Sequence, residues 1–282
     1  MSERRRRRWT AWIVLAPFFL FGLAFELLPM LTLVRSSFTT AAGWSLGNFS
    51  RAFTPVMIDS FRNSLQLSAA TALLGVIGGT AVAYAIVTSR RRVVRDTLTA
   101  LADVTANFGG APLAFAFIIT LGSTGVVTLL LKAAGISLYP HFRIYSVSGL
   151  AIAYVYFQLP LMILLIVPAL LGLKPEWREA ATNLGATRLQ YWLRVGLPVL
   201  APSLLGSFLL LFANAFGAYA TAWTLTGPDV NLVTVQIAAL VRGEVQLDPA
   251  LADALALVSL GVMGVCVVGY RWLATRPWRA AP

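Results

Sequence analysis

The chain has 282 residues, of which 58% are hydrophobic and only 12% are charged, and its mean hydropathy is +0.77. Soluble domains carry about 25% charged residues, so this chain has too little polar surface to coat a water-soluble globule. We therefore expect an integral membrane protein. A single Cys, Cys266, excludes an internal disulfide, and a single His, His141, excludes a multi-histidine metal site. We expect no metal.

Six stretches are apolar enough to cross the hydrocarbon core as helices, which takes about 20 residues each. In chain order they are roughly 11–34, 64–88, 98–122, 146–170, 199–222 and 250–272. The first follows an arginine run but is longer than a signal-peptide core, so we expect it to be retained. The third is the weakest, because Asp103, Asn107 and the Gly109–Pro112 stretch interrupt it. The expected fold class is an all-α integral membrane protein with six transmembrane helices.

The basic residues predict the orientation of these spans. With the N-terminus in the cytoplasm, sixteen of the 22 Lys and Arg fall on the cytoplasmic side. They lie at 4–8, 90–95, 174–194 and 271–279. The positive-inside rule then places both termini, 1–10 and 276–282, in the cytoplasm, with 11–275 as the transmembrane domain. The net charge of +11 is thus explained by topology, and we expect the lipid bilayer, not nucleic acid, as the partner of these charges.

The stretch 171–198 is the only long cytoplasmic loop between spans. Pro175 suits the first turn of a helix, where its missing N–H is not needed. Glu176 and Glu179 lie near the same N-terminus, where the helix dipole favours negative charge. Gly185 marks a break. The pattern therefore predicts a helix, a turn and a second helix that continues into the fifth span. The residues alone also allow an amphipathic linker lying on the membrane surface.

This loop resembles the signature of the permease subunits of ABC importers. That signature is Glu-Ala-Ala, three residues, Gly, nine residues, then Ile-x-Leu-Pro. The chain matches it, with Val195 in the Ile position, at Glu179, Ala180, Ala181, Gly185, Leu197 and Pro198. The position after the fourth of six spans also fits, so the chain is similar to the type I importer permeases of the MetI-like superfamily. Shorter likenesses at 25–38, 46–49 and 61–65 follow in the family's order.

The resemblance implies a function and a set of partners. In the family, the loop forms a coupling helix that docks on a separate ATP-binding subunit, and Glu179 would meet a basic residue there. A second permease, identical or paralogous, and an extracytoplasmic solute-binding protein are also implied, in the prokaryotic cell (inner) membrane. The chain has no Gly-x-x-x-x-Gly-Lys-Ser/Thr loop, so we expect no enzyme activity and no bound cofactor, and ATP would be used by partner subunits.

Polar residues inside the spans are candidates for the translocation path, because buried ionisable and polar groups are costly in a membrane. The candidates are Asn107, Gln158 and Asn214. The alternative is that they form hydrogen bonds between helices. Gly75 and Gly79 form a small-xxx-small pair, which favours helix packing.

The cargo is less defined by the sequence. The short six-span layout is similar to permeases of the polyamine, iron, thiamine and phosphonate branch, and we expect a polyamine or a related small solute. Sugar or other small-organic uptake is the alternative. A secondary transporter is disfavoured, because the two halves show no matching Gly/Pro interruptions and the 179–198 motif would have no role.

Overall fold

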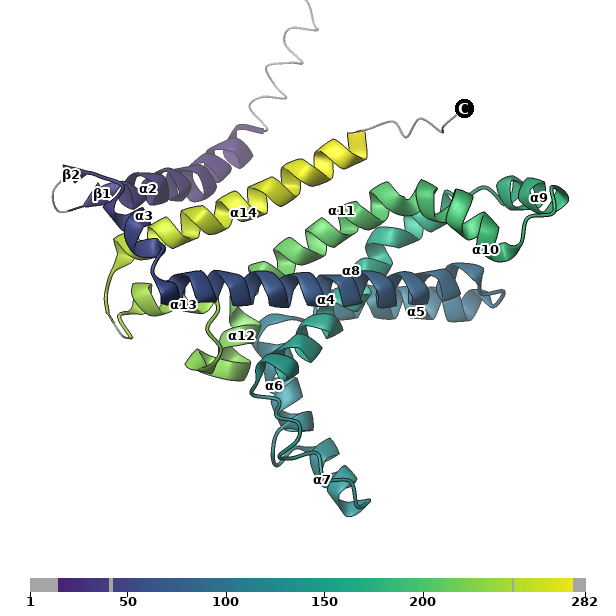
Figure 1. The fold of residues 1–282 in the computed structure, drawn as a ribbon, viewed down its shortest axis with the longest axis horizontal. Coiled ribbons are helices and arrows are strands. Elements are labelled where there is room, and N and C mark those ends of the chain that lie inside the picture. The colour runs from purple at the N-terminus through teal and green to yellow at the C-terminus, as the bar shows by residue number, and fades with distance from the viewer. Residues whose placement is uncertain (1–14, 41–42, 245, 276–282) are drawn as a thin grey trace, which may run out of the picture. The chain divides into compact units, whose positions relative to one another are not determined.

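The computed structural model describes residues 15–40, 43–244 and 246–275, so the expected arginine run at 4–8 and the tail at 276–282 lie outside the described residues. Within the described part the chain is almost entirely helical (Figure 1). Six helices are long and apolar enough to cross a membrane, with a seventh candidate if the broken pair at 219–242 is counted as one span. The expected all-α membrane fold class is confirmed.

The helices and strands follow in chain order. They are η1 (Leu23–Leu27), α2 (Leu28–Ser37), β1 (Thr39–Thr40), β2 (Gly43–Trp44), α3 (Gly47–Ala52), α4 (Pro55–Thr88), α5 (Arg92–Ala106), α6 (Gly110–Leu121), α7 (Val126–Ala133), α8 (Val147–Leu171), α9 (Pro175–Asn183), α10 (Arg188–Tyr191), η2 (Trp192–Gly196), α11 (Leu197–Phe216), α12 (Tyr219–Thr226), η3 (Gly227–Asp229), α13 (Val233–Arg242) and α14 (Pro249–Thr275). The residues divide into two compact units: 1–58 with 236–261, and 59–235 with 262–282.

The first unit is tied together by polar contacts of its short elements. Asn48 is buried, and its Nδ2 donates to the carbonyl oxygens of Ser37 at 3.1 Å and Thr39 at 3.0 Å. Arg51 forms an ion pair with Asp248, whose Oδ1 accepts from the backbone N–H of Leu251 at 3.1 Å and so caps α14. The Gly47-Asn48-Phe49 element noted in the sequence therefore has a structural role, because Asn48 holds the backbone that follows α2 in place.

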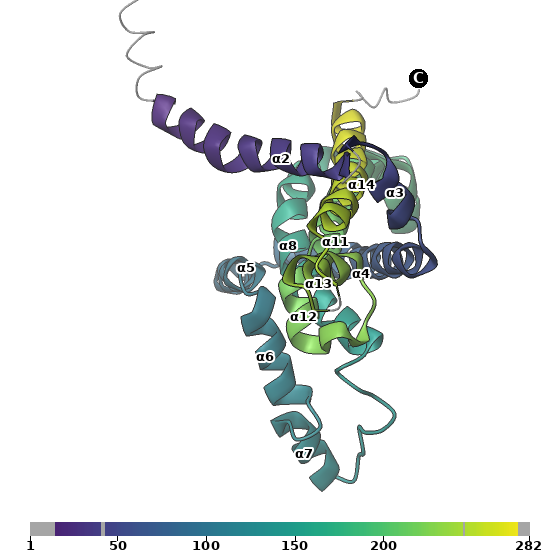
Figure 2. The same ribbon diagram turned by 90° about the vertical axis from the view of Figure 1, so that its left-hand side faces the viewer.

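The second unit is built around α8, which packs against α5 and α11. Its buried core joins residues of α6, α8, α11 and α12 and includes Tyr154. The Tyr154 hydroxyl donates to the carbonyl of Ala218 at 2.7 Å, where α11 has ended and α12 has not begun. α6 and α7 lead away from α8 in both views, and α12 lies beside α6 (Figures 1 and 2).

Two of the expected spans are wrong as single helices. The stretch 98–122 is divided into α5 and α6, because Gly109 is extended and Gly110 has a φ of +67°. The long apolar helical stretch at this place is instead Gly110–Ala133. Likewise 199–222 contains the end of α11 at Phe216 and the start of α12 at Tyr219. The sequence signal was present in both cases, since Gly residues stand at both breaks.

The expected outer loops also contain helix that the hydropathy pattern did not reveal. α4 begins at Pro55, well before the expected start at 64. The mostly polar stretch 59–63 belongs to this helix although it lies outside the apolar window. The stretch 223–249 contains the end of α12, η3 and α13. Hydropathy detects only the part of a helix that is apolar on all sides, so polar ends are missed.

Both π-helical turns precede a Leu-Pro pair. The backbone N–H of Leu28 bonds to Leu23, and that of Leu197 bonds to Trp192, one residue further back than in an α-helix. Pro29 and Pro198 follow, and a proline lacks the N–H for the helical bond and its ring crowds the carbonyl four residues back. The wider turn accommodates the ring, so the helix continues through each proline.

The Gly75/Gly79 pair is a packing surface, as the spacing predicted. A Cβ built on Gly79 would lie 2.5 Å from Cβ and 2.7 Å from Cγ of Met162 on α8. A Cβ on Gly75 would lie 3.0 Å from the Gln158 side chain and 2.9 Å from Leu211 on α11. These two glycines let α4 approach α8 and α11 closely.

We expect Gly79→Ala to destabilise the second unit by about 1–3 kcal/mol, because the added methyl overpacks the contact with the stem of Met162. Gly264→Ala is the matched control, since a Cβ there meets nothing within 4 Å and Ala favours a helix by up to about 1 kcal/mol over Gly. The thermal unfolding midpoint of the purified protein in detergent should fall for the first variant only. Equal midpoints would show that α4 and α8 do not meet at Gly79.

Candidate functional site

The segment between α8 and α11 has the expected form of a helix, a turn and a second helix. Pro175 occupies the first turn of α9. The helix ends in a Schellman motif, in which the N–H of Gly185 bonds to Thr182 and the N–H of Ala186 bonds to Ala181, both at 2.9 Å. Gly185 has a φ of +77°, the left-handed conformation that this motif requires. We call residues 172–196 the connecting segment.

The second half of the connecting segment is fixed by a capping box and a buried glycine. The N–H of Thr187 bonds to Oε1 of Gln190 at 2.8 Å, and the N–H of Gln190 bonds to the Thr187 hydroxyl at 3.3 Å. Further on, a Cβ at Gly196 would lie 2.5 Å from the Trp192 ring. Only a residue without a side chain fits at position 196. The sequence did not reveal this requirement, because the contact with Trp192 depends on the π-helical turn.

The two faces of α9 differ in chemistry. Trp177, Ala180, Ala181 and Leu184 recur at i, i+3, i+4 and i+7, which places them in one stripe. We call these four residues the apolar stripe. No residue of α9 is buried, and Leu184 is 87% exposed. Within the described part of the second unit, Trp177, Ala180 and Leu184 are exposed and Ala181 is half-buried, although this is the face that an amphipathic helix normally buries.

Glu179 lies on the other face of α9. Together with Arg178, Thr182 and Asn183 it lines an open hollow beneath the helix. The six signature residues are thus divided by the structure: Ala180 and Ala181 belong to the exposed stripe, Glu179 faces the hollow, Gly185 makes the turn, and Leu197 and Pro198 begin α11. Leu184 was expected on this face from the sequence, whereas Trp177 was not, although its spacing of three residues from Ala180 is the signal for it.

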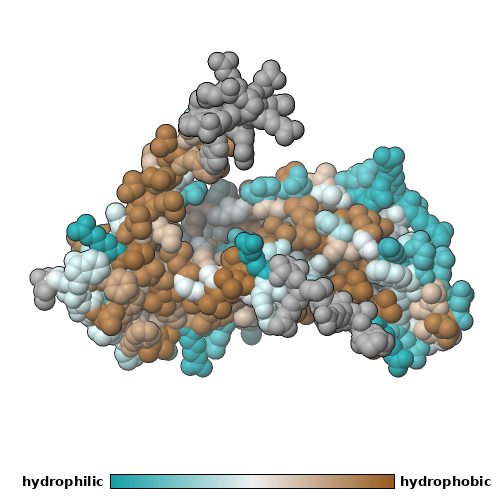
Figure 3. Space-filling model, turned by 90° about the horizontal axis from the view of Figure 1, so that it is seen from above, coloured by the Kyte–Doolittle hydropathy of each residue, from teal (hydrophilic) through white to brown (hydrophobic). Residues whose placement is uncertain are grey.

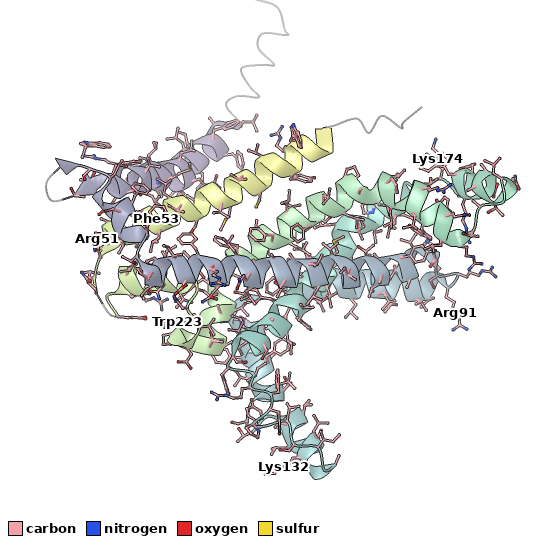
Figure 4. The ribbon with its side chains drawn as sticks, in the orientation of Figure 1. Arg51, Phe53, Arg91, Lys132, Lys174 and Trp223 are labelled. Carbon is pink, nitrogen blue, oxygen red and sulfur yellow. The ribbon has the colours of Figure 1, made fainter. Side chains whose placement is uncertain are left out.

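The connecting segment lies at a polar end of the second unit. Lys174 and Arg91, which begins the turn into α5, are at the same end (Figure 4). Hydrophilic residues gather at that end in the space-filling view, whereas hydrophobic residues cover the middle (Figure 3). Lys132, on α7, lies at a different place from this end (Figure 4).

The three candidate path residues have different environments. Gln158 is completely buried, and its Nε2 donates to the Thr71 hydroxyl of α4 at 3.0 Å. This is an interhelical hydrogen bond, the alternative considered from the sequence, so a path role for Gln158 is not supported by its position in the structure. Its Oε1 has no hydrogen-bond partner among the described residues. Asn214 is exposed on α11.

Asn107 belongs to a polar stripe on α5. Its Nδ2 donates to the carbonyl of Asp103 at 2.9 Å, and both side chains are exposed. Asp96, Thr99, Asp103 and Asn107 follow at intervals of three and four residues and therefore share one face. Leu101 and Val104, exposed by 56% and 70%, lie on another face. α5 is therefore amphipathic, although it was expected to be part of an apolar span.

No family model matches the chain, but individual relatives do. It is 28% identical over 222 residues to the molybdenum transport system permease protein ModB of Mycobacterium tuberculosis, covering 77% of this chain and 81% of the relative. It is 27% identical over 228 residues to the spermidine/putrescine transport system permease protein PotB of Haemophilus influenzae, covering 78% and 79%. Among solved structures, a bacterial ABC transporter that imports the acidic polysaccharide alginate aligns with a TM-score of 0.77 at 20% identity, over 96% of this chain and 98% of that one.

The chain therefore has the fold of ABC transporter permeases and is similar in sequence to permease subunits of importers. It is a multi-pass membrane protein, and its relatives are permeases named for the transport of small solutes.

Substituting Gly185 by Ala should weaken the turn after α9, because an L side chain in the left-handed region costs about 1–2 kcal/mol. A Cβ there meets nothing within 4 Å, so the effect would come from the backbone and not from a clash. Gly185→Asn should be milder, since Asn tolerates this conformation. Hydrogen exchange of the α9 amides is the measurement; equal exchange in the Ala variant and the unmodified protein would contradict the assigned turn.

Proposed function

We propose that this chain forms the translocation path of a binding-protein-dependent ABC importer together with a second permease subunit, and that α9 docks on a separate ATP-binding subunit. The observation that carries the proposal is the apolar stripe, an amphipathic face left uncovered at a polar end of the second unit. Exposed apolar surface rimmed by polar residues marks interaction sites. ATP hydrolysis is assigned to the partner, because the chain has no phosphate-binding loop.

The same proposal sets the orientation. α9 and the basic turn at 90–92 would lie in the cytoplasm, in agreement with the positive-inside rule, and both termini would be cytoplasmic in the prokaryotic cell (inner) membrane. Solute would arrive from an extracytoplasmic binding protein. Closure of the ATP-binding subunits would move α9, and α9 would move α8 and α11, to which it is joined, so that access alternates between the two sides.

Docking through the apolar stripe predicts that Leu184→Asp abolishes co-purification with the ATP-binding subunit. A charge in a desolvated contact typically costs at least about 2 kcal/mol of binding, roughly thirtyfold. Asn183→Asp is the matched control, because it adds the same charge on the same helix but on the face that lines the hollow. The measurement is the amount of ATP-binding subunit retained on the tagged permease.

If Leu184→Asp retained the subunit as well as Asn183→Asp, the stripe would not be the docking surface. Glu179→Lys is a third variant. A contact between Glu179 and a basic residue of the partner predicts lost coupling of ATP hydrolysis to transport. Loss with Glu179→Lys but not with Leu184→Asp would move the contact to the hollow side of α9.

We propose that the path runs along the polar stripe of α5. Asn107 and Asn214 remain in the proposed set of lining residues. Asp103 enters that set, and Gln158 leaves it. An aspartate facing lipid at the centre of a span costs about 2.5–3.5 kcal/mol, so Asp103 and its stripe should face water or protein. Leu101 and Val104 offer the lipid an apolar face instead. Water in the path between two permeases would solvate the stripe.

Cysteine labelling tests this assignment. In a Cys266→Ser background, the Asp103→Cys variant should react with a membrane-impermeant thiol reagent in inside-out vesicles, and the Leu101→Cys variant should not. The two positions are on the same helix, two residues apart, so depth is matched and only the face differs. Equal labelling of both variants, or labelling of the Leu101→Cys variant alone, would remove the stripe from the path.

For the cargo we propose a polyamine or a related small solute. The carboxylate of Asp103 on the proposed path suits a cation, whereas Asp96 is paired with Arg92 and Arg95. PotB is named for spermidine and putrescine transport. Sugar or another small organic solute is the alternative, and the ModB relative is named for molybdenum transport. Calorimetric binding of spermidine, molybdate and sugars to the purified binding protein separates these; micromolar sugar or molybdate binding without spermidine binding would overturn the cargo.

A secondary transporter remains the competing class. It would need no ATP-binding subunit, so loss of transport with Leu184→Asp and retention with Asn183→Asp would also argue against it.

A further inference from the structure

An open hollow of about 900 Å³ lies beneath the connecting segment, within the second unit. Its walls come from the last turn of α4, the end of α8, the inner face of α9 and the start of α10 and η2. The hollow is therefore enclosed on one side by helices that enter the membrane and on the other by the polar connecting segment. The docking proposed above uses the apolar stripe and, of the residues that line the hollow, only Glu179.

The charged lining of the hollow is mostly basic. Lys174, Arg178 and Arg188 line it, against one carboxylate, Glu179. Within the residues that the structure describes, none of the three cations forms a salt bridge. Lys174 lies 6.0 Å from the centre of the Trp177 ring, and both arginines are exposed. Three cations converging on one open space make it attractive to an anion.

The remaining lining has the character of a membrane interface. The Tyr84 and Trp192 rings meet edge to face, with centroids 5.2 Å apart, and both line the hollow. Tyr and Trp rings settle at the level of the lipid headgroups. Val87 and Leu170, from the ends of α4 and α8, supply apolar wall below them. The hollow thus combines an apolar side towards the spans with a basic side towards the connecting segment.

We propose that this hollow binds the phosphate of an anionic phospholipid headgroup, with the acyl chains lying along α4 and α8. Basic pockets between membrane helices on the cytoplasmic side hold anionic headgroups, and the arginine fork matches phosphate geometry. The apolar wall favours a lipid over free phosphate, because acyl chains can pack against it and inorganic phosphate cannot. The proposal takes from the proposed function only that this end of the second unit is cytoplasmic.

A lipid in this place would also brace the connecting segment. Arg178 is on α9 and Arg188 is on α10, on either side of the Gly185 turn, so one phosphate held by both would link the two helices. Binding a lipid and coupling to a partner would then be connected through the rigidity of that turn.

The test uses the intact complex of permease and ATP-binding subunits, purified in mild detergent and examined by native mass spectrometry. The unmodified complex should retain added phosphatidylglycerol over phosphatidylcholine. The Arg178→Gln/Arg188→Gln pair should retain about tenfold less, because each basic residue contributes appreciably to anionic lipid binding. Arg90→Gln/Arg91→Gln is the control, since these two basic residues are near the same end but outside the hollow.

Equal loss of phosphatidylglycerol in both double variants would overturn the proposal, since it would show only general attraction of positive charge. Binding of inorganic phosphate at millimolar concentration by a complex that retains no phosphatidylglycerol would assign the hollow to free phosphate and overturn the proposal as well. The conservative Arg178→Lys/Arg188→Lys pair should recover part of the retention.

A second measurement does not depend on substitutions. Photoactivatable phosphatidylglycerol in nanodiscs should cross-link to peptides covering 174–192 in the unmodified complex. Cross-links confined to other segments, with the ATP-binding subunit still bound, would remove the lipid site while leaving the proposed function intact. Absence of the ATP-binding subunit from the purified complex would instead contradict the proposed function.

Discussion

The close approach of α4 to α8 and α11 at Gly75 and Gly79 is the constraint on which the second unit depends. Without side chains at these positions, α4 lies directly against Met162, Gln158 and Leu211. In lipid there is no hydrophobic force between helices, so close van der Waals contact and interhelical hydrogen bonds must hold them together. The Gln158–Thr71 bond supplies one such link at the same junction.

This junction also positions the polar end of the second unit. Beyond this junction lie the last turn of α4, the end of α8 and the start of α11. The connecting segment joins the end of α8 to the start of α11. The Schellman turn at Gly185 and the π-turn before Pro198 then direct α9 and α10. The apolar stripe and the lining of the basic hollow lie on opposite faces of α9. The connections at the two ends of α9 set its orientation, and so they set the direction of both faces.

Interrupted helices distinguish this fold from a simple bundle of six rods. α5 gives way to α6 at Gly109–Gly110, and α11 gives way to α12 at Gly217–Ala218. The two breaks are close, since the Thr221 hydroxyl donates to the Gly110 carbonyl at 3.3 Å. Irregular backbone inside a membrane is tolerated only where protein or water satisfies it, and here Tyr154 and Thr221 bond to carbonyls at the two breaks.

The sequence by itself determined the membrane class, the approximate spans, the Gly75/Gly79 packing surface and the helix–turn–helix of the connecting segment. These depend on composition and on local spacing, which act over one or two helical turns. Only the tertiary structure decided that Gln158 is an interhelical bond, that the third span is broken, and that Glu179 and the apolar stripe lie on opposite faces of α9. Those outcomes depend on which neighbour each side chain meets, and neighbours such as Thr71 and Gln158, 87 residues apart, are brought together only by the fold.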